Sequence, residues 1–316
     1  MIESEVIIVG GGPAGSACAW RLRQQKINCI VLDQALFPRF KPCAGWITPD
    51  VLRDLEFDLP DYPHGLTPFT QFDITMYGFH FILPTKQYSI RRYEFDDWLL
   101  RRSGAPVYAH RVQEIRHDRG VYFIDNQFCA PYLVGAGGTH CPVFHTLFKP
   151  HLANPRKSLI VAQEEEFRYE GLDDRCRLWF FENKLPGYSW YVPKKDGYLN
   201  VGVGGSAGQL KSNGDTLKNH WNLLVNKLAD LGLVRDHPYK PVGHSYYLRE
   251  RSSEVSRGNA FLVGDALGLA TKDMGEGIGP AVQSGLLAAK AIARGGEYSV
   301  DHIPRYSFPS LLRFRR

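Results

Sequence analysis

The sequence lacks the features that would place it in a membrane, metal-binding or secreted class. Its 316 residues contain no apolar run that approaches the roughly 20 residues of a membrane-spanning helix. No two of the six cysteines are spaced as CxxC, and no two histidines have metal-ligand spacing. Single, scattered cysteines without a secretory signal peptide are typical of a reducing compartment. We therefore expect a cytoplasmic protein without a metal site.

Dense clusters of charge are also scarce, although the formal net charge is +5. Basic residues are nowhere interleaved closely with aromatics, which argues against a nucleic-acid partner. One basic cluster is present, at Arg313, Arg315 and Arg316. It is either a solvated tail or a contact with anionic lipid head groups, so we expect at most peripheral contact with the inner face of a membrane.

A glycine-rich stretch near the start has the pattern of a dinucleotide-binding turn. Residues 6–9 form a short apolar run, as in a buried parallel strand, and a helical stretch follows at about 16–25. Between them lies a G-x-G-x-x-G triplet: Gly10, Gly12 and Gly15. A second apolar run at 29–33 ends in Asp33, which would accept the adenosine ribose hydroxyls. The alternative is a strand–helix turn that is merely tight.

A second glycine-rich helix entrance lies near the end of the chain. An apolar run at 260–263 ends in Gly264-Asp265, and Gly275, Gly277 and Gly279 precede an apolar helix that runs to about Arg294. A bare backbone before a helix N-terminus suits a flat ring that becomes negatively charged, such as a reduced flavin. Asp265 belongs either to that site or to an ordinary turn.

With these motifs in place, the sequence resembles the geranylgeranyl reductase family, within the p-hydroxybenzoate hydroxylase-like FAD enzymes. Beside the two helix entrances, three pieces carry the resemblance in the family's order: residues 37–45 (FPRFKPCAG), residues 92–96 (RYEFD), and Tyr188, Trp190 and Pro193 followed by Gly202 and Gly204. One turn departs from the family: residues 135–138 read Gly-Ala-Gly-Gly, without the usual carboxylate.

The resemblance implies an FAD site whose residues come from all of these motifs. The expected cofactor-binding residues are Gly10, Gly12, Pro13, Ala14, Gly15, Asp33, Arg39, Cys43, Ala44, Arg92, Val112, Gly264, Asp265, Gly275, Gly277 and Ile278. Arg39 and Arg92 would hold FAD phosphate or a substrate head group; ordinary salt bridges are the alternative. Cys43 is either a thiolate beside the flavin or a small buried hydrophobic residue.

The glycines of the segment 187–204 are unusual for a strand, because glycine leaves nothing to pack and weakens it. The resemblance implies that this strand faces the flavin across a substrate cavity, with Tyr188, Trp190, Pro193, Gly202 and Gly204 contacting the substrate. It also implies that Cys43, Tyr188 and Trp190 take part in catalysis. The alternative for the two aromatics is ordinary core packing.

The fold that the resemblance implies is α/β: a doubly wound, Rossmann-like FAD domain with an inserted, β-sheet-rich substrate domain. We assign residues 1–72, 92–150 and 245–316 to the first domain, and 73–91 and 151–244 to the second. Strands are expected at 159–167, 177–181 and 198–203, with a covering helix at 217–233.

The implied activity is FAD-dependent reduction of carbon–carbon double bonds in an isoprenoid or similarly apolar, lipid-like substrate, by hydride from reduced flavin. Two alternatives remain open. One is a flavin-dependent monooxygenase (hydroxylase or epoxidase) or halogenase-like enzyme; the other is a non-catalytic FAD-binding protein, which the Gly137 departure favours. No second nucleotide motif is visible, so the redox partner is either NAD(P)H, docking transiently, or a ferredoxin.

Overall fold

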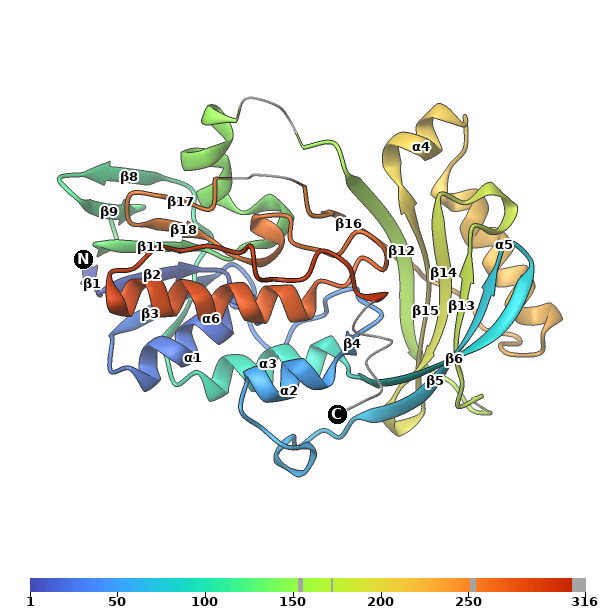
Figure 1. The fold of residues 1–316 in the computed structure, drawn as a ribbon. Helices are drawn as coiled ribbons and strands as arrows, with labels where there is room; N and C mark the ends of the chain where they lie inside the picture. The colour runs from blue at the N-terminus through green and yellow to red at the C-terminus, as the bar shows by residue number, and fades with distance from the viewer. Residues whose placement is uncertain (153–155, 172, 251–253, 309–316) are drawn as a thin grey trace. The chain divides into compact units, whose positions relative to one another are not determined.

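A computed structural model describes residues 1–152, 156–171, 173–250 and 254–308 (Figure 1). The chain divides into two compact units, each built from segments that are far apart in the sequence. The first unit contains Met1–Arg39, Tyr93–Arg156 and Tyr247–Ser307. The second contains Phe40–Arg92, Lys157–Tyr246 and Phe308. Among the helices of these residues, none combines the length and the apolar character that crossing a membrane requires.

A six-stranded sheet lies at the centre of the first unit, with the strand order β17-β18-β11-β2-β3-β7. All neighbouring pairs are parallel except β17 with β18. No residue of β2 is more than 5% exposed, as expected for a parallel strand covered on both faces. The strands are β2 (Val6–Val9), β3 (Cys29–Asp33), β7 (Val107–Ala109), β11 (Tyr132–Gly135), β17 (Ser256–Arg257) and β18 (Ala260–Leu262).

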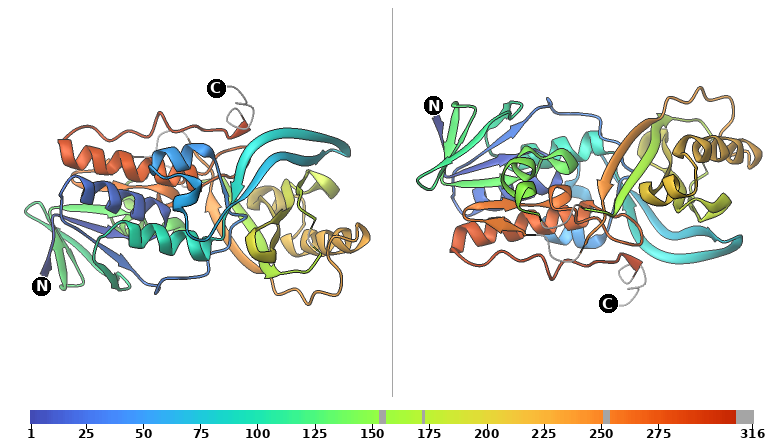
Figure 2. Two further views of the ribbon diagram at one scale, coloured as in Figure 1. Left: turned by 90° about the horizontal axis from the view of Figure 1, so that it is seen from below. Right: turned by 90° about the horizontal axis from the view of Figure 1, so that it is seen from above.

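Two of the first unit's helices pack side by side, α1 (Pro13–Gln24) and α6 (Ile278–Arg294) (Figures 1 and 2). Gly285 permits this approach, because a Cβ there would lie 2.2 Å from the carbonyl oxygen of Ala14. A third helix, α3 (Arg92–Arg102), follows the second unit's β6. A separate four-stranded sheet has the order β1-β10-β9-β8 and is formed by β1 (Ile2–Glu3), β8 (Ile115–Asp118), β9 (Val121–Ile124) and β10 (Phe128–Ala130).

An eight-stranded sheet forms the second unit, with the order β16-β12-β15-β14-β13-β5-β6-β4. Its strands are β4 (Trp46–Ile47), β5 (Thr67–Met76), β6 (Phe79–Ser89), β12 (Leu159–Arg168), β13 (Cys176–Phe180), β14 (Gly187–Pro193), β15 (Tyr198–Ser206) and β16 (Val242–Tyr247). The unit also contains three α-helices among its described residues: α2 (Pro49–Asp54), α4 (Ala207–Ser212) and α5 (Leu217–Asp230).

The two faces of this sheet differ in what covers them. One face packs against α5: Tyr191, Val201 and Val203 share a buried apolar cluster with Trp221 and Leu224 of that helix. Side chains alternate along a strand, so Tyr188, Trp190 and Glu164 point to the other face. The strand pairing aligns Glu164, Gly202 and Trp190 in one row across β12, β15 and β14. We call this side, opposite α5, the aromatic face.

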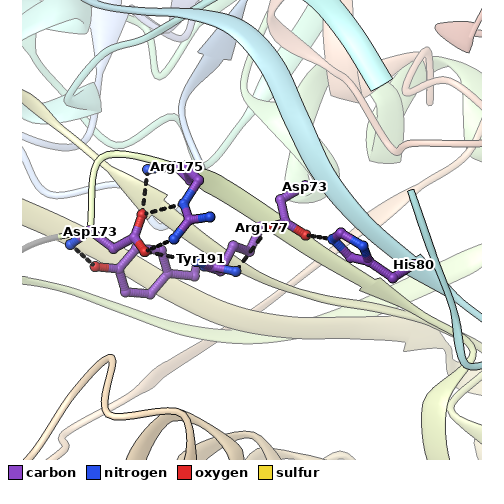
Figure 3. Close-up of polar contacts among 6 residues, drawn as sticks. All are labelled: Asp73, His80, Asp173, Arg175, Arg177 and Tyr191. Atoms are coloured by element: carbon purple, nitrogen blue, oxygen red, sulfur yellow. Dashed lines mark hydrogen bonds and ion pairs between the residues drawn. The ribbon is translucent and has the colours of Figure 1, made fainter. Parts of the chain in front are cut away.

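The polar network in Figure 3 lies on the α5 side of the sheet, opposite the aromatic face. Asp173 accepts hydrogen bonds from Arg175 and Arg177, and Arg177 also pairs with Asp73 at 2.9 Å. Burial acts to raise the pKa of Asp173. The hydrogen bonds from the two arginines outweigh it and hold that pKa well below its usual range. The carboxylate is therefore ionised at neutral pH.

The α/β fold class predicted from the sequence is confirmed, and the predicted strands and the helix covering them are present. The boundaries differ mainly in one segment. Residues 40–72, which we assigned to the FAD domain, belong to the second unit. The reason is that β4 lies within this segment, β5 begins in it, and both strands are hydrogen-bonded into the eight-stranded sheet. The amino-acid sequence of residues 40–72 does not indicate which of the two sheets its strands join. Elsewhere, Arg92, 245–246 and Phe308 fall in the second unit, and 151–152 and Arg156 fall in the first.

Candidate functional site

The first glycine turn leaves no room for side chains. A Cβ at Gly10 would lie 2.3 Å from the carbonyl oxygen of Ala136, and a Cβ at Gly15 would lie 1.9 Å from that of Gly10. Gly10 also has φ +113°, a conformation that other residues rarely adopt. Gly10 and Gly15 are therefore required by the turn itself, which brings the start of α1 against the ends of β2 and β11.

Gly12 has a different role, because the space beside it is open. It is the N-cap of α1, and no side chain caps the helix there. A Cβ at this position would meet the guanidinium of Arg39 at 3.5 Å. Arg39 also pairs with the buried carboxylate of Asp96 at 3.3 Å. Free N–H groups, the positive end of a helix dipole and a guanidinium together form a site suited to a phosphate group.

Asp33 at the end of β3 holds this turn in place. Its Oδ2 accepts a hydrogen bond from the Gly11 N–H at 2.7 Å, and its Oδ1 accepts one from Ala35 at 2.9 Å. Each carboxylate oxygen has a further lone pair, so the contacts within the protein leave acceptor capacity for ribose hydroxyls. Val112, after β7, is half-buried and packs on the first unit's core.

The second helix entrance has a similar bare terminus. Gly277 is the N-cap of α6, without a side-chain cap, and a Cβ there would lie 3.5 Å from Asp265 Oδ1. The backbone N–H of Gly264 donates to Ser284 Oγ at 2.9 Å, and a Cβ on Gly264 would lie 3.0 Å from that of Ala14. Gly264 and Asp265 thus sit beside the first turn of α1. Both expected glycine motifs are brought together within one unit.

The loop before α6 is closed by residues that sequence reasoning missed. Thr271 donates its N–H to the Glu276 carbonyl at 2.9 Å and accepts from the Glu276 N–H through Oγ1 at 3.0 Å. Ser307 donates to the Glu276 carboxylate at 3.0 Å. These contacts fix the backbone of Gly275, whose N–H donates to the Thr271 carbonyl. No local sequence pattern could have predicted the role of Ser307, because it lies 31 residues after Glu276 in the chain.

These residues fit an FAD dinucleotide. The fit rests on the two uncapped helix N-termini, at Gly12 and Gly277, and on the guanidinium of Arg39 beside the first of them. Ala14 and Ile278 lie in the first turns of the two helices, where backbone N–H groups have no partner within the helix. Pro13, which has no N–H, occupies the first position of α1.

In the second unit, Trp190 explains one glycine of β15, Gly202. The Trp190 indole lies directly over Gly202: a Cβ on Gly202 would be 2.2 Å from Cζ2 of the ring. The indole N–H donates to Asn200 Oδ1 at 2.6 Å, and the side chain is buried. Gly204 is less constrained, since a Cβ there would meet Ala162 and Trp190 at 3.5 and 3.6 Å. The space above Gly202 is therefore filled by the protein's own indole.

Tyr188 extends this surface into an aromatic wall. Its ring stacks on Phe180 with centroids 4.8 Å apart and on Trp46 at 6.5 Å. Trp46 in turn contacts Phe72 at 5.6 Å. Burial raises the pKa of the Tyr188 hydroxyl well above its usual value, so this phenol stays neutral. The aromatic face of the sheet thus carries a cluster of contacting rings, from Trp190 through Tyr188 to Phe180 and Trp46.

A buried lysine that the sequence analysis missed fixes the segment around Cys43. Lys194 follows Pro193 directly, and its Nζ donates to the carbonyls of Ala44 at 2.7 Å and Ile90 at 2.6 Å. The backbone N–H of Gly45 donates to Cys43 Sγ at 3.3 Å, and Cys43 is half-buried. Burial lowers the pKa of Lys194. Cys43 and Ala44 therefore lie in the second unit with β14.

Arg92 also lies in the second unit. It is buried. Burial is the main cause that lowers the pKa of His244, and the charges of Lys41 and Arg92 add to that effect. The charge of Arg92 also partly offsets the effect of burial on the pKa of Glu164. The structure thus places Arg92 near the charged groups of the eight-stranded sheet. The expected cofactor residues are divided between the units: Cys43, Ala44 and Arg92 in the second, and the others in the first.

Comparison with known proteins gives relatives whose similarity extends over nearly the whole chain. Residues 8–71 match the model of the NAD(P)-binding Rossmann-like domain. An uncharacterised protein of Methanosarcina barkeri is 32% identical over 93% of this chain and 75% of its own length. The menaquinone reductase of Mycolicibacterium smegmatis is 28% identical (93% and 77% covered). The geranylgeranyl diphosphate reductase of Rhodobacter capsulatus is 26% identical (92% and 75%).

The fold is shared with solved flavoprotein structures. A geranylgeranyl bacteriochlorophyll reductase-like protein from Thermoplasma acidophilum superposes with a TM-score of 0.78 at 21% identity, covering 93% of this chain and 79% of its own. The flavin-dependent brominase Bmp2 gives 0.72 at 19% identity, covering 93% and 79%. These TM-scores show that the chain has the p-hydroxybenzoate hydroxylase-like fold, and at 19–21% identity they show the fold alone.

Proposed function

Because this chain belongs to the geranylgeranyl reductase family of FAD-dependent oxidoreductases, we propose that it reduces carbon–carbon double bonds in an isoprenoid chain. The observation that carries the proposal is the aromatic face, where Tyr188 and Trp190 of the motif that resembles the family form a cluster of rings with Trp46. The aromatic rings suit a flat, unsaturated hydrocarbon, whose burial is favourable by about 25 cal/mol per Å² of apolar surface.

Each unit has its own part in this proposal. The first unit binds FAD, with the pyrophosphate at Gly12 and Arg39 and the ribose at Asp33. When bound and reduced, FAD supplies the hydride. The second unit binds the hydrocarbon on its aromatic face, excludes water from it and stabilises positive charge that develops on carbon, because ring faces are electron-rich. Cys43, in the segment that Lys194 fixes through the Ala44 carbonyl, takes part in catalysis.

The finer assignments are proposals as well. The substrate is a lipid, a quinone side chain or a pigment precursor carrying isoprenoid units, as the names of the relatives suggest. The electron donor is NAD(P)H or a ferredoxin. The enzyme works in the cytoplasm with at most peripheral contact at the membrane. The basic cluster on which we based that contact, Arg313, Arg315 and Arg316, lies outside the described residues.

The decisive experiment is anaerobic reoxidation of the photoreduced holoenzyme. We would add a geranylgeranyl glycerolipid, menaquinone or oxygen separately, follow the flavin spectrum, and identify products by mass spectrometry. The proposal predicts reoxidation by a polyprenyl compound, with a gain of two hydrogens per double bond reduced. Reoxidation by oxygen alone would refute it. In a parallel aerobic reaction with the lipid and oxygen together, a hydroxylated or epoxidised product would instead establish the monooxygenase alternative, and a brominated product formed when bromide is also added would establish the halogenase-like one. A protein that binds FAD without turnover in any of these reactions would be non-catalytic.

A further inference from the structure

The aromatic face contains one carboxyl group that the fold does not account for. Glu164 lies on β12 directly opposite Gly202, and it is 1% exposed. Its Cβ would be 2.7 Å from a Cβ on Gly202, so the glycine leaves room for both the Glu164 side chain and the Trp190 indole. Glu164 therefore shares a row of the sheet with the ring that the proposed function places against the substrate.

Both carboxyl oxygens of Glu164 are buried and have no hydrogen-bond partner among the described residues. The next residue on the same face, Glu166, is satisfied: it accepts from Arg91 Nε at 2.8 Å, and Lys194 lies 3.6 Å away. A buried polar atom without a partner costs about 1–3 kcal/mol, so native proteins rarely keep one without a use. The Glu164 carboxyl group thus lies on the aromatic face without a hydrogen bond that would give it a structural role.

Burial also determines the protonation state of this group. It raises the pKa of Glu164 to about 8, with a smaller contribution in the same direction from Glu166. The cations Lys194, Lys41 and Arg92 act in the opposite direction. Tyr188 also faces the group, as a neutral phenol whose own pKa is raised well above its usual value. Near neutral pH Glu164 is therefore mostly a neutral acid with a proton to give.

We propose that Glu164 is the proton donor of the reduction, an inference that rests on the proposed function. Bound reduced FAD supplies the hydride, with both electrons, to one carbon of the double bond. The other carbon forms its C–H bond with the proton of the Glu164 carboxyl group, whose O–H bond breaks. The resulting carboxylate is stabilised by Lys194, Lys41 and Arg92 and takes a proton from solvent before the next turnover.

The other acidic groups of the face are less suited to this step. An acid is most effective when its pKa lies near the working pH. The pKa of Tyr188 is far above that range. The ammonium of Lys194 already donates to two backbone carbonyls that fix the Cys43 segment. Glu164 alone among these three combines a matched pKa with oxygens that make no other contact.

The test compares Glu164→Gln with Glu165→Gln, a control on the same strand whose side chain points to the opposite face and pairs with His237. In the anaerobic reoxidation assay with a geranylgeranyl glycerolipid, we expect Glu164→Gln to be slower by roughly 10²- to 10⁴-fold, the usual contribution of a general acid. Flavin content should be unchanged, and the wild-type rate should fall as pH rises through about 8. That fall should be absent in the variant.

A second measurement needs no turnover. The infrared difference spectrum of the holoenzyme should contain a carboxylic-acid carbonyl band that disappears as pH rises through about 8 and that Glu164→Gln removes. An ionised Glu164 at pH 6, or a Glu164→Gln enzyme with the wild-type rate and pH profile, would overturn the inference while leaving the reductase function intact. A wild-type enzyme that no polyprenyl acceptor reoxidises would refute both.

Discussion

A single methyl group added at Gly202 tests how the aromatic face is built. In the Gly202→Ala protein the new Cβ would lie 2.2 Å from Trp190 Cζ2 and 2.7 Å from Glu164 Cβ. The indole is the part that has to move, and moving it breaks the bond from its N–H to Asn200. Overpacking costs about 1–3 kcal/mol and a buried hydrogen bond about 1, so we expect a loss of about 2–4 kcal/mol.

Gly204 provides a matched control two residues along the same strand. A Cβ there would have ordinary contacts, the nearest at 3.5 Å to Ala162. Gly204→Ala should therefore change stability by less than about 1 kcal/mol, and the smaller freedom of the unfolded chain favours a slight gain. Neither glycine has a positive φ, so both substitutions test space and not backbone strain.

The assay is equilibrium urea unfolding of the FAD-saturated protein, followed by circular dichroism, with tryptophan fluorescence as a second probe. Gly202→Ala should lower the midpoint without changing the slope, because the same surface is exposed on unfolding. If both variants were equally stable, the close approach of Trp190 to β15 would be refuted. That result would also refute the explanation that Gly202 is glycine because the Trp190 indole lies over it.

Three further predictions concern charged groups. Glu164→Gln should remove a pH dependence of stability. Because folding raises the pKa of Glu164 to about 8, the unfolding free energy of the wild-type protein should fall by roughly 4–5 kcal/mol as pH rises from about 4.5 to 8. The difference between the urea midpoints at pH 5 and pH 8 should therefore be smaller in the variant than in the wild type. Arg39→Ala should weaken FAD binding by roughly 10- to 100-fold in a fluorescence titration, because a phosphate contact is lost. If that is the cause, adding Asp96→Asn to this variant should not restore affinity; recovery in the double variant would show that the unpaired Asp96 carboxylate was the cause instead. Lys194→Met should release the Cys43 segment, so that iodoacetamide labels Cys43 faster than in the wild type, whereas Lys195→Met at the exposed neighbouring position should not change the rate.

Part of the candidate site could be predicted because its signals are local. The first glycine turn needs bare backbone within a few residues of itself, and the clashes at Gly10 and Gly15 confirm that requirement. The apolar and aromatic content of three segments likewise predicted β12, β13 and β15, because such residues are enriched in strands. The glycines of β15 were also noticed from the sequence, although the Trp190 indole, which requires glycine at position 202, could not be identified there.

Lys194 and Glu164 show where sequence reasoning stops. In the sequence, Lys194 is one of two adjacent lysines after Pro193, and Glu164 is one of three consecutive glutamates. Nothing local says that Lys194 is buried against Ala44 and Ile90 while Lys195 is exposed. Pairing of β12 with β15 buries Glu164 and leaves Glu165 on the opposite face. A charged residue's burial depends on which distant strand lies beside it.

By itself, the sequence determined the two bare helix entrances, the strand that carries Tyr188 and Trp190, and the family to which these motifs point, because each depends on residues close together in the chain. The tertiary structure decided which segments join which sheet, as for 40–72, and which polar groups lose contact with water. The pKa of Glu164 is the clearest case. It is set by desolvation and by three cations that are distant in sequence, and only the folded sheet brings these together.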